Sequence, residues 1–328
     1  MQKKIAQKQK LNTQYDLRPV SLVTSSTTKG TRLKSKNPLL GIVLVICAVA
    51  CFAVLDTSVR YVGSFFPIAL VLWVRYGLHT VIMTIYISVS TGHSFRTDRP
   101  MFQMSRGALL AFASTMSFAA LQRMPVAAFT SIILLAPVFV TIFARVWLKE
   151  NVSLLRWGLV LGSFIGALIV IRPSTGIVGW PAILPLIVAI SSAGFQIMTS
   201  RFGGDEDPFT TNFYTGVIGV ALATPLLLSS AIDPWTLLSN AGANELFALF
   251  CVAALGTSGH LLLIMALAKA PASTLMPFQY AQLGFAALTG YVVFNSVPDA
   301  LGWVGMSVIA LCGAASAWLN VRKVTTYH

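Results

Sequence analysis

Charged residues are scarce in this chain, and acidic residues are the scarcest. Of its 328 residues only 10% are charged, with 10 Asp and Glu against 23 Lys and Arg. A soluble domain normally carries about 25% charged residues, so a soluble fold of this length would lack its polar surface. Because 56% of the residues are hydrophobic, we expect the solvent of this protein to be the lipid bilayer.

Several kinds of functional site are also missing from the sequence. Its four cysteines lie inside apolar segments, without the spacing of a disulfide framework or a zinc site. The sequence has no P-loop, dinucleotide fingerprint or HExxH motif, and no nucleophile beside a base. We therefore predict no metal, no cofactor and no enzyme activity. The alternative is a membrane-embedded enzyme or a sensor without transport activity.

The sequence does contain long apolar segments. A helix needs about 20 apolar residues to cross a hydrocarbon core of about 30 Å, and backbone in lipid must be helical to satisfy its own hydrogen bonds. Ten segments meet this condition, and short proline-containing connections separate them. The fold class predicted is an all-α membrane protein with ten transmembrane helices, near residues 39–62, 66–90, 103–121, 126–148, 153–171, 176–199, 209–230, 245–268, 272–295 and 300–320.

The net charge of +13 is explained by membrane topology. The basic residues lie between apolar segments and in the N-terminal tail rather than beside exposed aromatics, so nucleic acid is not expected as a partner. With the N-terminus inside, 19 Lys and Arg fall on the inner side and three on the outer side. Loops on the cytoplasmic side are enriched in Lys and Arg. We predict a multi-pass protein of the cell inner membrane with both termini in the cytoplasm.

The membrane part divides into two halves of five spans each. Residues 1–37 are predicted to be a disordered basic cytoplasmic tail, 38–173 the first repeat, 174–321 the second repeat and 322–328 the cytoplasmic C-terminus. An odd number of spans per half gives the halves opposite orientations, with a binding site at their pseudo-twofold axis. A shift of 141 residues lays Arg60 on Arg201 and Pro67 on Pro208, and a shift of 146 lays Pro125 on Pro271 and Trp157 on Trp303.

Short motifs in the first half have a characteristic order and spacing. They are Phe66-Pro67, Trp73 to Arg75, Met124-Pro125, Ser131 to Pro137, Leu148 to Glu150, Gly158, Gly162, Gly166 and Ile171 to Pro173. This pattern resembles the EamA repeat of the drug/metabolite transporter superfamily over roughly residues 39–320. In the second half Asn295-Ser296 replaces Lys149-Glu150.

The resemblance implies ten spans in two inverted EamA repeats. It also implies transport of a small solute such as an amino acid, a nucleotide-type metabolite or a vitamin. The stretch from Phe52 to Asp56, with Pro67 and Trp73 to Tyr76, is similar to the bacterial riboflavin-importer branch. We expect a secondary transporter of a small metabolite that works by alternating access. Its oligomeric state stays open, with a homodimer as one alternative.

Two opposite charges lie at membrane depth. Arg75 is about nine residues, or about 14 Å, inside its span, and Asp56 lies in the outer third of the first span. A charge at this depth costs about 2.5–3.5 kcal/mol on insertion scales. In the second half the corresponding residues are Gly216 and Ile197. We predict that Arg75 and Asp56 pair or line the substrate cavity; the alternative is an ion pair that only locks two helices.

Other polar residues inside the spans are further candidates. His79 lies one turn from Arg75, and we consider His79, His260 and Asp56 for proton coupling; hydrogen bonding inside the bundle is the alternative for the histidines. Glutamine and tyrosine can orient a polar solute in a mainly apolar pocket. The remaining substrate-binding candidates are Gln196, Tyr214, Gln279, Gln282 and Trp73. Pro137 and Pro277 are expected to interrupt the fourth and ninth helices.

Overall fold

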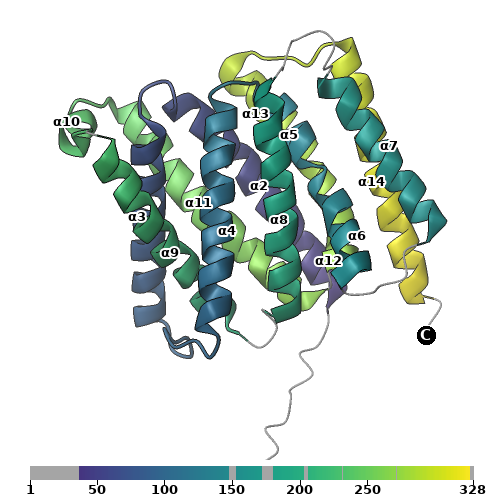
Figure 1. Cartoon of the computed structure of the whole chain (residues 1–328), viewed down its shortest axis with the longest axis horizontal. Helices are drawn as coiled ribbons and strands as arrows, with labels where there is room; N and C mark the ends of the chain where they lie inside the picture. The colour runs from purple at the N-terminus through teal and green to yellow at the C-terminus, as the bar shows by residue number, and fades with distance from the viewer. Residues whose placement is uncertain are drawn as a thin grey trace, which may run out of the picture. The chain divides into compact units, whose positions relative to one another are not determined.

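The computed structural model describes residues 37–147, 153–171, 180–202, 206–230, 232–270 and 272–325. These residues are helices joined by short connections, with no β-strand among them. The predicted tail, the Lys149-Glu150 pair and the last three residues lie outside this part of the chain. We call the end at which the first described helix begins the proximal end, and the opposite end the distal end (Figure 1).

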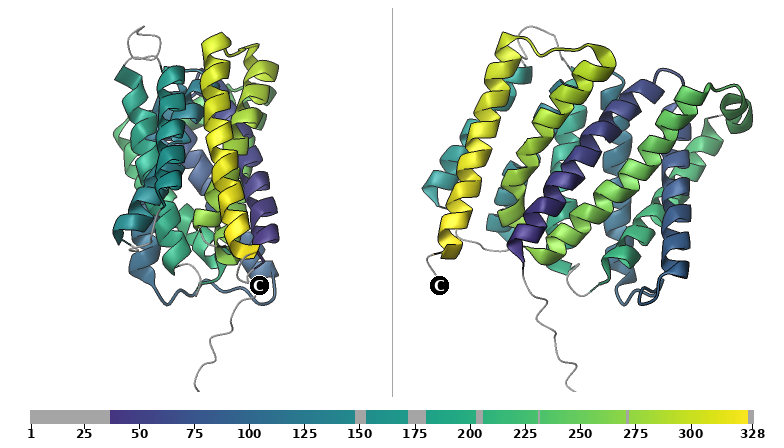
Figure 2. Two further views of the ribbon diagram at one scale, coloured as in Figure 1. Left: turned by 90° about the vertical axis from the view of Figure 1, so that its right-hand side faces the viewer. Right: turned by 180° about the vertical axis from the view of Figure 1, so that it is seen from behind.

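The helices form two layers (Figure 2). In the layer seen from behind, neighbouring helices pack in the order α14, α13, α2, α11 and α3. Their bounds are α14 Ala300–Thr325, α13 Ala281–Phe294, α2 Pro38–Val62, α11 Ala243–Lys269 and α3 Ile68–Val89. The short α12 (Ala272–Leu275) and the 3₁₀ turn η4 (Met276–Tyr280) precede α13. The second layer packs in the order α7 (Leu154–Ile171), α5 (Val126–Ile133) with α6 (Ala136–Trp147), α8 (Ile183–Phe202), α4 (Pro100–Leu121) and α9 (Pro208–Ser229).

Contacts between the layers occur along their length. At the two ends α7 packs against α14 and α3 packs against α9, and between them α5 packs against α13. Numbered as the sequence predicts them, the spans of one layer lie in the order ten, nine, one, eight and two, and those of the other layer in the order five, four, six, three and seven. Exchanging each span of the first half with its counterpart five spans later turns one order into the other. This is the relation that an internal repeat of five spans gives.

Prolines start several helices. Pro38, Pro100, Pro208 and Pro234 occupy first-turn positions, where the missing N–H has no intrahelical partner to lose. The Asp207 carboxylate accepts a hydrogen bond from the Thr210 N–H at 3.3 Å and caps α9. Asp233 caps α10 (Pro234–Ser239), a short helix that the hydropathy pattern did not predict.

Two spans are interrupted. The fourth predicted span is divided between α5 and α6 at Leu134–Leu135, just before Pro137. The ninth is divided among α12, η4 and α13, with Pro277 at the start of the 3₁₀ turn. The expected interruptions are therefore present, and they occur at corresponding places in the two halves. The counterpart of the Lys149-Glu150 pair, Asn295, ends α13 in a left-handed conformation with φ of 50°.

Seven helical segments of the described residues are long and apolar enough to cross a membrane. They are Pro38–Val62, Ile68–Val89, Pro100–Leu121, Val126–Phe143, Trp180–Arg201, Pro208–Ser229 and Ala243–Lys269. Large apolar side chains on these and neighbouring helices are exposed, such as Val89 at 80% and Leu154 at 90%. Contiguous apolar surface of this kind faces a partner or lipid. The predicted segment 272–295 is not among the seven because it breaks at η4, and α7 and α14 contain the shorter apolar stretches Trp157–Val170 and Ala300–Ala315.

Candidate functional site

A cavity of about 110 Å³ lies between the two layers. Side chains from α2, α3 and α11 in one layer and from α4 and α8 in the other line it, together with residues beside the breaks in the fourth and ninth spans. The interruptions therefore place irregular backbone at a cavity, which is where a membrane protein tolerates it.

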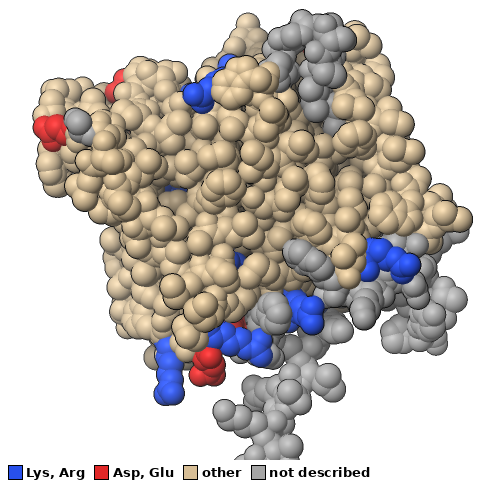
Figure 3. All heavy atoms as spheres, in the orientation of Figure 1, with Lys and Arg blue, Asp and Glu red and all other residues tan. Residues whose placement is uncertain are grey.

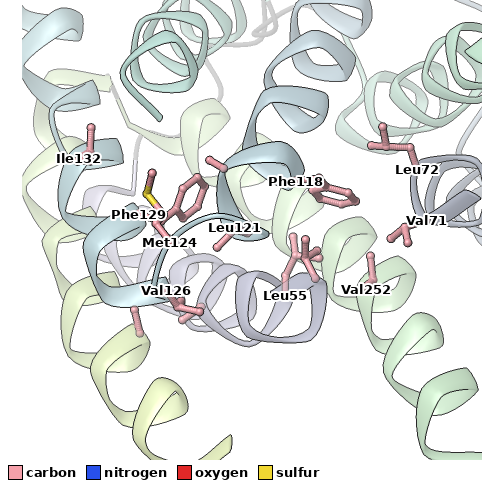
Figure 4. Packing of buried hydrophobic residues seen from close by; sticks show 14 of the residues in the cluster. Leu55, Val71, Leu72, Phe118, Leu121, Met124, Val126, Phe129, Ile132 and Val252 are labelled. Atoms are coloured by element: carbon pink, nitrogen blue, oxygen red, sulfur yellow. The ribbon is translucent and has the colours of Figure 1, made fainter. Parts of the chain in front are cut away.

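Apolar clusters flank the cavity on its distal and proximal sides. The distal cluster includes Leu55 and Phe118, which also line the cavity; Figure 4 shows both beside Val71, Leu72 and Val252. The proximal cluster includes Val49, Leu110 and Phe195, which line the cavity from the other side. The polar side chains between the clusters are buried.

Arg75 is the centre of a hydrogen-bond network in this cavity. Its side chain is 2% exposed. Nη1 donates to Ser114 Oγ at 2.6 Å and to Tyr76 Oη at 3.3 Å. Nη2 lies 3.3 Å from His260 Nε2, and because a guanidinium has only donors, this imidazole nitrogen must accept. The Nε–H of Arg75 is buried without a partner.

A carboxyl and three amides add to the polar lining. Gln282 Nε2 donates to Asp56 Oδ2 at 3.3 Å, which joins α13 to α2. Gln279 Nε2 donates to Gln196 Oε1 at 2.8 Å. Within the described residues no ion pair is found between Asp56 and Arg75, whereas His93 and Asp207 form one at the proximal end. Of the two predicted arrangements, pairing or lining the cavity, Arg75 and Asp56 have the second: both line the cavity.

Aromatic rings cover the sides of the cavity. The ring of His260 lies 4.9 Å from that of Phe52 and 6.0 Å from that of Phe195, centroid to centroid. The Arg75 guanidinium lies 5.5 Å from the centre of the Phe118 ring. These rings offer stacking surfaces beside groups that form hydrogen bonds, which is the common composition of a small-molecule site.

Most of the residues predicted for the site come together in the cavity. Asp56, Arg75, Gln196, His260, Gln279 and Gln282 all line it. His79, Trp73 and Tyr214 do not. His79 is buried with both ring nitrogens unpartnered. The Tyr214 hydroxyl donates to the Phe95 carbonyl at 2.9 Å, at the proximal end.

Sequence reasoning missed the burial of Arg106. Its place in the sequence predicts a basic residue of the inner side, whereas its side chain is 0% exposed. It lies six residues after the start of α4 and donates to the Thr211 carbonyl and to Thr215 Oγ1 of α9. The available signal was the spacing of Gln103, Arg106, Leu110 and Ser114, which places them on one face of a helix.

Acidic, histidine and cysteine side chains are dispersed. The part of the chain that the structure describes contains no group of three or more that could hold a metal ion, and its four cysteines are free.

Exposed basic side chains gather at the proximal end (Figure 3). Arg96, Arg99, Arg145 and Arg201 are exposed there, whereas Arg123 is the exposed basic residue at the distal end within the described residues. The distribution is the one expected when the proximal end faces the cytoplasm.

Known proteins are similar to this chain over most of its length. A riboflavin transporter of Vibrio cholerae is 27% identical over 88% of this chain and 96% of its own. An S-adenosylmethionine uptake transporter of Rickettsia prowazekii is 26% identical over 80% of this chain and 87% of its own. A pseudopaline exporter of Pseudomonas aeruginosa is 24% identical over 84% of this chain and 95% of its own.

Fold and family comparisons agree with these similarities. A solved crystal structure has the same fold, with a TM-score of 0.66 and 16% identity over 86% of this chain and 98% of its own. The family model for EamA-like transporters matches twice, at residues 39–172 and 179–318. The chain is therefore a multi-pass membrane transport protein that belongs to the EamA-like transporter family.

Proposed function

We propose that this protein is a secondary transporter of a small metabolite and that the cavity around Arg75 and Asp56 is its substrate site. The observation that carries the proposal is the buried cavity itself, in which an arginine with an unpartnered Nε–H, a carboxyl group and three glutamines face phenylalanine rings. An amino acid or a riboflavin-like vitamin has both the hydrogen-bonding edge and the apolar part that such a lining accommodates.

In this proposal the chain crosses the membrane ten times, as two inverted repeats of five spans within 38–173 and 174–321. The matching order of spans in the two layers supports it, and so do the two family matches. The basic side chains at the proximal end support a cytoplasmic location of both termini and an inner-membrane orientation. A homodimer remains an alternative that chemical cross-linking in membranes would test.

Alternating access would come from rocking one half against the other around the fixed site. Opening the distal cluster would expose Asp56 and Arg75 to one side, and opening the proximal cluster would expose them to the other. We expect binding and movement of an unchanged solute rather than covalent chemistry. Asp56 and His260 are the titratable groups that line the cavity, so they are our candidates for proton coupling.

The test is a transport assay in cells that express the protein. Uptake and efflux of radiolabelled riboflavin, S-adenosylmethionine and amino acids are measured for the natural chain, for Arg75→Ala and for Gly77→Ala. Gly77 is two residues from Arg75 on α3, and a methyl group there meets no atom within 4 Å. A solute moved by the natural chain and by Gly77→Ala, but not by Arg75→Ala at equal protein level, supports the proposal. Equal transport by Arg75→Ala contradicts the site, and no transport of any solute contradicts the function.

A further inference from the structure

A second cavity, of about 210 Å³, lies between α3, α4 and α9. We call it the lateral cavity. Gly219, Leu222, Ala223 and Leu226 line it on α9, and their spacing of three or four residues places them on one face of the helix. Seven residues of helix span about 10 Å, so the lining extends over about this length along the helix. The other lining residues are Leu72 and Tyr76 of α3 and Ala108, Ala111, Phe112 and Thr115 of α4.

The lateral cavity has an apolar lining. Tyr76 and Thr115 are its polar side chains, and both hydroxyls are bonded elsewhere. Thr115 Oγ1 donates to the Ala111 carbonyl at 3.0 Å, and Tyr76 Oη donates to Ser114 Oγ at 2.9 Å. A buried water molecule needs polar partners, whereas an apolar cavity of about 150 Å³ stays dry and binds a small hydrocarbon. The chemistry of the lining therefore fits a hydrocarbon ligand.

The mouth of the lateral cavity lies between α4 and α9, which pack side by side in the layer nearer the viewer in Figure 1. Phe112, Leu222 and Leu226 are exposed at the mouth, whereas Leu72 and Tyr76 are each 1% exposed and form the floor on α3. No charged residue occurs in α9 or in the part of α4 that lines the cavity. The cavity thus opens sideways, onto an apolar surface of a membrane protein, where the surrounding molecules are lipid chains.

Tyr76 separates the lateral cavity from the cavity around Arg75. The two cavities share no lining residue. The ring of Tyr76 lines the lateral cavity, and its hydroxyl donates to Ser114, which lines the other cavity and also accepts from Arg75 Nη1 at 2.6 Å. A methyl group at Gly219 would lie 2.2 Å from the ring, so the ring rests on the backbone of α9. An occupant of the lateral cavity would therefore pack on the ring whose hydroxyl belongs to the Arg75 network.

We propose that the lateral cavity binds one acyl chain of a membrane phospholipid, which packs on the ring of Tyr76. Four of the lining residues are alanine or glycine, and their small side chains leave the space open. An empty cavity would lose van der Waals contacts along its lining, and a chain from the adjacent lipid restores them without passing through water. This lipid site is independent of the transport function proposed above.

The test is photolabelling with a phospholipid that carries a diazirine in one acyl chain. The full chain is reconstituted in vesicles of phosphatidylethanolamine and phosphatidylglycerol with a small fraction of this probe, and the labelled residues are mapped by mass spectrometry. Lipid around the protein can label the exposed Phe112 and Leu222, but a chain must enter the cavity to reach Leu72 and Tyr76. We expect label on both pairs of residues. Label on Phe112 and Leu222 without label on Leu72 or Tyr76 would overturn the proposal.

Filling the cavity provides the matched comparison. Ala223→Leu places a larger side chain in the lateral cavity, whereas Ala221→Leu makes the same change at an exposed position of α9. Labelling of Leu72 and Tyr76 should fall about tenfold or more in Ala223→Leu, which corresponds to a loss of about 1.4 kcal/mol in binding free energy. It should stay unchanged in Ala221→Leu. Ala108→Leu, on the α4 side, is the second filling variant if Ala223→Leu does not fold. Equal labelling of Leu72 and Tyr76 in the filling and control variants would contradict the site.

Solutes test whether the cavity belongs to lipid or to substrate. Labelling of Leu72 and Tyr76 should persist in an excess of riboflavin, S-adenosylmethionine or phenylalanine. If one of these solutes abolishes it and leaves Phe112 labelled, the apolar part of the solute occupies the cavity and the proposal is wrong. Transport is measured separately on the same vesicles, so the lipid site can fail while transport stands, and transport can fail while Leu72 and Tyr76 are labelled.

Discussion

Replacement of Gly256 by alanine would test the position of Arg75 without altering any polar group. Gly256 lies on α11 one turn before His260, so both residues face the Arg75 side chain. A methyl group at Gly256 would lie 2.9 Å from Arg75 Nε and 3.4 Å from Nη2. Atoms of real proteins do not approach so closely, and the flexible end of the arginine must move. The Arg75–His260 hydrogen bond is already 3.3 Å long, so a shift of a few tenths of an ångström breaks it.

The expected magnitude follows from that hydrogen bond. A hydrogen bond to a charged group contributes about 1.5–3 kcal/mol, which corresponds to roughly a 10- to 150-fold change in affinity. We expect Gly256→Ala to raise the KM for the transported solute by roughly tenfold or more. Helix stability should not fall, because alanine is favoured over glycine in a helix interior by about 0.5–1 kcal/mol.

The assay is initial uptake against solute concentration, normalised to the amount of protein in the membrane. Gly77→Ala and Gly284→Ala are the matched controls, because a methyl group at either glycine meets no atom within 4 Å. Both should transport as the natural chain does. Unchanged KM in Gly256→Ala would refute the reasoning that the position of Arg75 determines substrate affinity. A loss of protein in Gly256→Ala alone would show that the methyl group is accommodated by helix movement rather than by the arginine.

Three further predictions concern packing and protonation. Gly219→Ala should lower thermal stability in detergent, because its methyl group would lie 2.2 Å from the Tyr76 ring and overpacking costs about 1–3 kcal/mol; a melting temperature equal to that of Gly290→Ala, where there is open space, would contradict this. Asp56→Asn should flatten the pH dependence of uptake, because Asp56 lines the cavity, whereas His79→Gln should leave it intact, because His79 does not; the opposite result would make His79 the proton sensor. Hydrogen bonds from the Thr236 hydroxyl and the Trp235 N–H hold the pKa of Asp233 below its ordinary value, so the stabilisation of α10 is present above the unfolded-state pKa and is lost as the pH falls through the folded-state pKa. An NMR titration should show a rise of that pKa in Thr236→Ala, and an unchanged pKa would contradict the assigned cause.

The helices and much of the cavity lining could be predicted because polar residues are rare in apolar spans. Arg75, Asp56 and Gln282 stand out in sequences of leucine, valine and alanine, and an interior polar group must face other polar groups or water. That these three side chains meet in one cavity can therefore be predicted without knowing how the helices pack. Tyr214 lies only six residues after the start of α9. Its hydroxyl reaches the connection at Phe95, so it does not need a polar partner in the cavity.

Arg106 could not be assigned from sequence because its position relative to the membrane edge decides its role. Near the start of a span an arginine normally extends to the headgroups. Here α4 begins at Pro100, and Thr211 and Thr215 of α9 face the arginine. A contact between residues more than a hundred positions apart determines its burial. Local hydropathy contains no information about such a contact.

Helix packing explains why the second half has no arginine at the position that corresponds to Arg75. The residue of the second half that corresponds to Arg75 is Gly216. A methyl group at Gly216 would lie 2.8 Å from Thr80 Oγ1 and 3.1 Å from His79 Cδ2, so α9 can pack this closely on α3 only without a side chain there. Arginine at this position would separate the two helices. The first half therefore supplies the cavity's buried cation and carboxyl, Arg75 and Asp56, while the second half supplies His260, Gln279 and Gln282. In the proposed function, a substrate that contacts Arg75 would also contact side chains of the second half, so a relative movement of the two halves would move the substrate.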